Sequence, residues 1–219
     1  LDLWITSEGI SPQAWDQLAD WRRAGLFDHR HTFNHMYGAI PESAWNAIRE
    51  AGATIDVCPR SDSQYQLGEG IGGLQATLDH GIRPGISVDN ETSYGTDMFS
   101  EMRVGYHMQR ALVTQRKAKG EANVPEPITP RDMLEFATAR GAWCAGLLNK
   151  AGTLTPGKEA DIVLIRTDAI NTLPLTNAVA TVVQFASNQN VDTVFVAGMA
   201  RSARGSSTPT ISSRVRRPA

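Results

Sequence analysis

The feature that most constrains the fold of this chain is an alternation, four times over, of a short apolar run with a segment of helical spacing. The apolar runs are residues 1–6, 31–37, 53–58 and 83–88, and the helical segments are 12–24, 41–51, 70–80 and 96–119. Strands that alternate with helices across short loops are typical of a parallel sheet with helices outside it. Because the crossovers in such a sheet are right-handed, the four units predict an α/β fold: half a barrel or half of a doubly wound sheet.

The pattern changes after residue 120. A Pro-containing linker over 121–129 leads into a helix expected at 131–148, and two strands are expected at 160–165 and 191–197. We therefore divide the chain into a strand–helix region (1–120), a linker with a helix (121–149), a β-rich region (150–200) and a tail (201–219).

The tail carries five arginines and no acidic residue, in a sequence of Ser, Arg, Pro and Gly with almost no apolar content. Such a segment buries too little apolar surface to fold, so we expect disorder over 201–219. A basic binding arm is the alternative.

Composition excludes several classes of protein. The 219 residues carry 21 basic and 23 acidic side chains, which excludes a globally basic nucleic-acid-binding domain. We find no run of about 18 apolar residues and no signal peptide, so we expect no membrane association. The two cysteines, Cys58 and Cys144, read as reduced thiols, which favours a cytoplasmic location.

Residues suited to acid–base chemistry stand near the ends of the expected strands. Glu8 follows the first, His35 lies in the second, and Asp89 directly follows the fourth. Functional residues of parallel α/β folds gather at the carboxyl ends of strands. Other interpretations stay open: Asp89 or Asn90 as a turn cap, His35 as a core histidine and Glu8 as a solvated loop acid. One His, one Asp and one Glu are not by themselves a metal motif.

Several segments, in order along the chain, also carry a resemblance to a known family. These are HMYG with Pro41–Glu42 (35–42), CPRSD with LG and GI (58–71), SVD (87–89), DMFSEMR (97–103) and TLTPGKEADIV (153–163). Over roughly residues 1–200 the chain resembles the C-terminal half of the amidohydrolase superfamily, in its cytosine-deaminase-like and chlorohydrolase-like branch. The second segment resembles that branch's CPRSN…LGxGI loop.

The resemblance implies the C-terminal half of a (β/α)8 TIM-type barrel, strands five to eight, with part of a small β domain over 150–200. A complete barrel takes about 250 residues. The family's His-x-His metal pair on the first strand is absent from this sequence. Its fifth-strand metal histidine corresponds to Ile5, so the resemblance implies a fragment with an incomplete or altered metal site.

For the intact parent, the resemblance implies a metal-dependent hydrolase that acts on non-peptide carbon–nitrogen bonds. A zinc or iron ion would activate water, with Asp89 as metal ligand and proton acceptor. Glu8 would shuttle a proton, and His35 would form a hydrogen bond with the attacking oxygen. In binuclear relatives the corresponding histidine binds a second metal. Arg60, Ser61 and Asn90 would contact the substrate, expected to be a small heterocyclic amine.

The isolated chain is expected to hold no metal tightly and to be inactive. Half a barrel leaves two sheet edges unpaired, so we expect association, including a possible homo-oligomer. A metal-free binding or structural protein of the same fold is the alternative, since it explains Ile5. A doubly wound cofactor-binding domain is disfavoured because no Gly-rich phosphate loop follows a strand.

Overall fold

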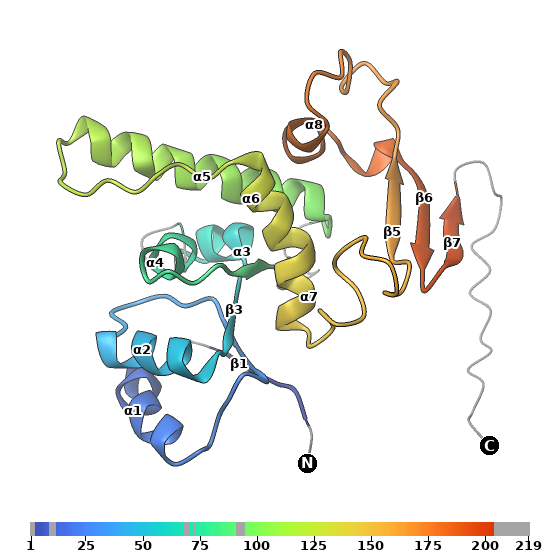
Figure 1. Ribbon diagram of the computed structural model, residues 1–219. Coiled ribbons are helices and arrows are strands. Elements are labelled where there is room, and N and C mark those ends of the chain that lie inside the picture. Colours follow the sequence, from blue (N-terminus) through green and yellow to red (C-terminus); the bar gives the residue numbers. More distant parts are fainter. Residues whose placement is uncertain (1–2, 9–11, 68–70, 72, 91–94, 204–219) are drawn as a thin grey trace, which may run out of the picture.

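A computed structural model describes residues 3–8, 12–67, 71, 73–90 and 95–203, and shows an α/β fold built on a parallel sheet (Figure 1). The four strands of this sheet are β1 (Ile5–Glu8), β2 (His31–Asn34), β3 (Thr54–Val57) and β4 (Gly85–Ile86). They lie in the order β1-β2-β3-β4, and every neighbouring pair is parallel. The predicted parallel sheet is confirmed.

Five helices accompany this sheet: α1 (Pro12–Arg23), α2 (Glu42–Ala51), α3 (Pro59–Gln64), α4 (Leu74–Asp79) and α5 (Met98–Ala118). Their ends follow the local sequence. Gly52 ends α2 in the left-handed conformation, with φ of 67°. The side chain of Asp97 caps α5 by accepting a hydrogen bond from the Ser100 amide at 2.7 Å.

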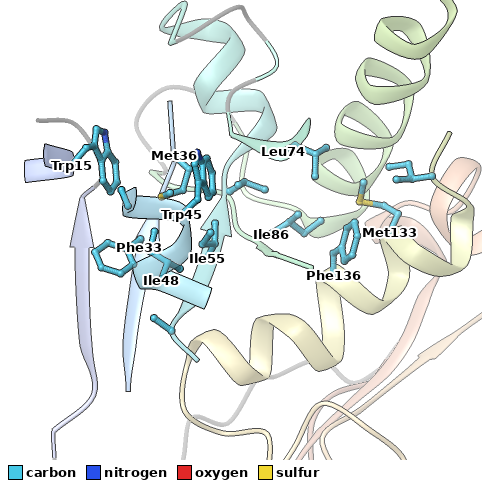
Figure 2. Packing of buried hydrophobic residues seen from close by; sticks show 14 of the residues in the cluster. Trp15, Phe33, Met36, Trp45, Ile48, Ile55, Leu74, Ile86, Met133 and Phe136 are labelled. Atoms are coloured by element: carbon cyan, nitrogen blue, oxygen red, sulfur yellow. The ribbon is translucent and has the colours of Figure 1, made fainter. Parts of the chain in front are cut away.

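The two faces of the parallel sheet differ in chemistry. Phe33, Ile55 and Val57 belong to one buried apolar cluster with Trp15 of α1 and Ile48 of α2 (Figure 2). Because side chains alternate along a strand, the residues between them point to the opposite face. That face is polar: Thr32 and Thr54 share a hydrogen bond of 2.7 Å, and the Ser87 hydroxyl donates to Asp56.

A helical segment from residue 130 packs beside β4. It consists of α6 (Pro130–Glu135), a π-helical turn (Phe136–Arg140) and α7 (Gly141–Cys144), with Phe136 in the apolar core. At its far end the carbonyl of Cys144 accepts a hydrogen bond from the Thr32 hydroxyl at 2.7 Å, on the polar face of the sheet. A Cβ at Gly85 would lie 2.9 Å from the Cys144 sulfur, so this contact requires glycine.

Farther along the described residues, a second, antiparallel sheet consists of β5 (Ile162–Ile165), β6 (Val191–Val196) and β7 (Met199–Ala203). A helix, α8 (Ala178–Gln184), and a 3-10 turn (Asn188–Asn190) precede β6. The guanidinium of Arg103 in α5 donates to the carbonyls of Gln184 and Ala186 at 2.9 and 2.6 Å. These bonds join the segment at the end of α8 to α5, and the two helices lie near each other in Figure 1.

The observed elements differ from those expected in three ways. The strands are shorter, and the first lies at Ile5–Glu8 rather than at 1–6. The sequence reading missed α3, α8 and β7 altogether. Residues 201–203, assigned to a disordered tail, complete β7, while 204–219 and the predicted helix start at Gly70 lie outside the described residues.

Within the described ranges, no helix has the length and apolarity needed to cross a membrane. Cys58 and Cys144 are free thiols.

Candidate active site

The carboxyl edge of the parallel sheet brings together side chains from the ends of its four strands. Glu8 is the last residue of β1, His35 directly follows β2, and α3 begins at Pro59 just after β3. Asp89 follows β4. Since all four strands run in the same direction, these residues share one edge of the sheet.

His35 lies between two carboxylates. Its Nδ1 is 2.7 Å from Oδ1 of Asp62, and its Nε2 is 3.3 Å from Oε2 of Glu8. The Asp62 side chain is fully buried and the His35 side chain is 6% exposed, whereas that of Glu8 is 56% exposed. The imidazole therefore connects a buried carboxylate with one that faces solvent.

The surroundings of His35 favour its protonated form. The hydrogen bond that the His35 ring donates to Asp62 raises the pKa of His35, and the charges of Asp62, Glu8 and Asp89 act in the same direction. Burial opposes this effect because it penalises the charged ring. The hydrogen bond outweighs burial, so the pKa of His35 lies above its ordinary value.

Asp89 is held by its neighbours in the site. The Ser61 hydroxyl donates to Oδ2 of Asp89, and the Asn90 side-chain amide donates to the same atom at 3.0 Å. Asp89 and His35 both have left-handed backbones, with φ of 72° and 68°. This conformation is uncommon for residues other than glycine and is enriched at functional sites.

The predicted substrate-contacting residues have defined places. Nε of Arg60 is 2.6 Å from Oε2 of the buried Glu101, and the Arg60 amide donates to Oε1 at 3.0 Å. Ser61 is buried with its hydroxyl on Asp89, and Asn90 borders the same carboxylate. Their contact with a substrate stays a prediction.

The CPRSD segment predicts no partner for His35, although its last residue, Asp62, makes the shortest hydrogen bond to the His35 ring among the described residues. One signal was present: the chain reads CPRSD where the resembling loop reads CPRSN, so a carboxylate stands at a position where the pattern has an amide. Only the fold shows that this residue reaches the ring after β2.

A metal ion fits the described residues poorly. In the part of the chain that the structure describes, no group of three His, Cys, Asp or Glu side chains is arranged to hold one. Both ring nitrogens of His35 face carboxylates, and Ile5, at the expected histidine position, has no lone pair to offer. Structural and catalytic zinc sites use at least three protein ligands.

Comparison with protein families and curated proteins gives consistent matches. The model of the amidohydrolase family matches residues 17–200. A 5-methylthioadenosine/S-adenosylhomocysteine deaminase of Desulforudis audaxviator is 35% identical over 191 residues, which cover 87% of this chain and 40% of that protein. A probable guanine deaminase of Deinococcus radiodurans is 30% identical, over 75% of this chain and 35% of that protein. An S-triazine hydrolase of Gordonia rubripertincta is 32% identical, over 69% and 30%.

Solved structures agree with these matches. An adenosine deaminase from Xanthomonas campestris with bound zinc superposes with a TM-score of 0.69 at 25% identity, over 84% of this chain and 39% of that one. Guanine deaminase of E. coli, at 19% identity, has the same fold with a TM-score of 0.72, over 93% and 48%. The chain thus spans less than half the length of these relatives. Because the family match covers most of the sequence, the chain belongs to the amidohydrolase family.

Proposed function

We propose that this chain supplies the residues that move protons in a hydrolase. The enzyme would release an amino group from carbon in small heterocyclic amines. The observation that carries the proposal is the placement of Glu8, His35 and Asp89 at the carboxyl edge of one parallel sheet. The relatives described above, two named as deaminases and one as a triazine hydrolase, support the reaction class and the substrate class.

The architecture we propose is half of a (β/α)8 barrel over residues 1–120, joined through 121–149 to part of a small β domain over 150–200. Among the described strands, β1 pairs only with β2 and β4 pairs only with β3. Parallel sheets are stable when both faces are covered and edges are paired or closed. Four further strands, from outside the described residues, would close the barrel.

The side chains suggest a division of labour. Asp89, an acceptor oriented by Ser61 and Asn90, would take a proton from the attacking water. The protonated His35 would donate a hydrogen bond to the oxygen as negative charge develops there. Glu8, exposed and 3.3 Å from Nε2 of His35, would carry a proton to the leaving nitrogen.

A divalent metal, zinc or iron, is proposed for the intact protein alone, because a solved relative contains zinc. The described residues do not complete a site for it. Asp89 and His35 could contribute to such a site only together with ligands from outside the described residues, so we assign no step to the metal.

The test is a chimera in which residues 1–200 replace the matching segment of the Desulforudis audaxviator deaminase, which then supplies the remaining strands. We expect ammonia release from adenine-, guanine-, cytosine- or triazine-type substrates. Glu8→Gln should lower the rate by about 10²-fold or more, as expected for loss of a general acid. Glu50→Gln, at an exposed position in α2, is the matched control. A folded chimera in which Glu8→Gln and Glu50→Gln release ammonia equally would contradict the proposal.

A metal-free binding protein is the second candidate, and Ile5 favours it. The Ile5 side chain is 46% exposed at the start of β1, opposite His31, and offers no ligand atom. This alternative predicts that the chimera binds heterocyclic amines without releasing ammonia. It also predicts that Ile5→His gives no gain in bound metal.

A further inference from the structure

We propose that Asp62 is a positioning residue that keeps a hydrogen on Nδ1 of His35 and so directs Nε2 toward Glu8. The inference rests on the proposed function for its catalytic meaning. Its geometry stands on the contacts of Asp62 alone.

The backbone holds Asp62 firmly. Its amide donates to the Cys58 carbonyl at 2.8 Å in the first turn of α3, and its carbonyl accepts from the Leu67 amide at 2.8 Å. The ion pair between Arg60 and Glu101 fastens the same helix to α5. The carboxylate is therefore fixed relative to the sheet, and it does not follow the imidazole wherever the ring turns.

The contact selects one state of the ring. The ionised form of Asp62 has no hydrogen to donate, so at a distance of 2.7 Å it accepts and Nδ1 carries the hydrogen. In the neutral imidazole this leaves the lone pair on Nε2, the nitrogen 3.3 Å from Glu8. A ring rotated by half a turn about its Cβ–Cγ bond would lose the contact with Asp62.

A purely structural role explains the carboxylate poorly. Oδ2 of Asp62 is buried and has no hydrogen-bond partner among the described residues, so one oxygen of a buried acid is left unsatisfied. Such a group is destabilising, and an apolar side chain of similar size would avoid the penalty. Among the described residues, the one side-chain hydrogen bond of this carboxylate is that with His35.

The test is ¹⁵N NMR of the histidine rings in the full 219-residue chain, at a pH where the imidazoles are neutral. His35→Gln assigns the His35 signal. We expect hydrogen on Nδ1 of His35 in the wild type. Asp62→Asn should keep this tautomer because its amide oxygen also accepts, whereas Asp62→Leu should shift a large part of the population to hydrogen on Nε2.

His80 is the control within the same spectrum, since its Nδ1 faces the carbonyl of Ala76 at 2.7 Å, away from Asp62. Its signal should be unchanged in both variants, which shows that they are folded. Hydrogen on Nε2 of His35 in the wild type would overturn the proposal, even if the Leu variant fails to fold. An unchanged His35 signal in folded Asp62→Leu would also overturn it. The reading needs no substrate, so it is independent of the chimera assay.

Discussion

Asp56 is a half-buried acid on the polar face of the sheet, next to the candidate site. Burial raises its pKa to about 6, while the hydrogen bond from Ser87 opposes the shift. The folded state therefore binds the proton more tightly than the unfolded state, whose pKa is 3.8. The contribution of protonated Asp56 to the free energy of unfolding is fully present below pH 3.8. It is lost as the pH rises through about 6.

Asp56→Asn keeps an acceptor for Ser87 and removes the charge. We expect the variant to be more stable than the wild type above pH 6 by up to about 3 kcal/mol, with the difference vanishing near pH 4. Urea unfolding at several pH values measures it, and Asp16→Asn at an exposed position of α1 is the control. A difference that stays constant from pH 4 to pH 8 would show that Asp56 does not titrate this way.

Gly73 supports the backbone that presents His35. A Cβ at this position would lie 2.1 Å from the carbonyl oxygen of His35 and 2.5 Å from that of Met36. These are backbone atoms, so the strand end would have to shift. We expect Gly73→Ala to cost at least about 1–3 kcal/mol of folding stability, as overpacking does. Gly95→Ala, with open space around it, should be near neutral. Equal midpoints of thermal unfolding for Gly73→Ala and Gly95→Ala would contradict this close packing.

At the scale of elements, the contact between α3 and α5 depends on a buried ion pair. Glu101 is fully buried and accepts from both the side chain and the backbone amide of Arg60. Removing one partner leaves a buried charge without compensation, which costs about 3–5 kcal/mol. We expect Glu101→Gln to destabilise the chain by an amount of this order in urea unfolding, and Glu50→Gln to leave it unchanged. A loss as small as that of the control would mean that α3 is held by other contacts.

Some helices could be predicted from the sequence and others could not. Pro41 and Gly52 mark the ends of α2 closely, because proline and glycine act on the local backbone. Pro59 directly follows the apolar run 53–58 and is also the first residue of α3. The run AVATVVQ gives no helical signal since its β-branched residues favour strands, and α8 forms there because the run packs against α5 and α6.

The candidate site likewise has residues that the sequence predicts and contacts that only the fold determines. Glu8, His35 and Asp89 could be identified because they stand at the ends of apolar runs, a feature of the linear sequence. The partner of His35 could not, because Asp62 lies 27 positions away and reaches the ring only through the turn into α3. The bond from Ser61 to Asp89 likewise depends on how two loops meet in space.

The exposed β1 edge of the parallel sheet is the part of the molecule where we expect association with other chains. Leu3, just before β1, is 57% exposed and Ile5, its first residue, is 46% exposed. Among the described residues β1 has one strand neighbour. Exposed apolar edge strands pair with other chains. We expect sedimentation velocity to show association that increases with concentration, and Ile5→Lys to reduce it. A monomer at every concentration tested would contradict this expectation.

We propose that this chain provides the acid–base residues of a hydrolytic site and that its described residues do not complete a metal site. Elemental analysis of the purified 219-residue chain for zinc and iron, with an ammonia-release assay on the same sample, tests it most directly. We expect far less than one metal ion per chain and no ammonia from cytosine-, guanine- or triazine-type substrates. One metal ion per chain, with ammonia release that Asp89→Ala abolishes, would contradict the account.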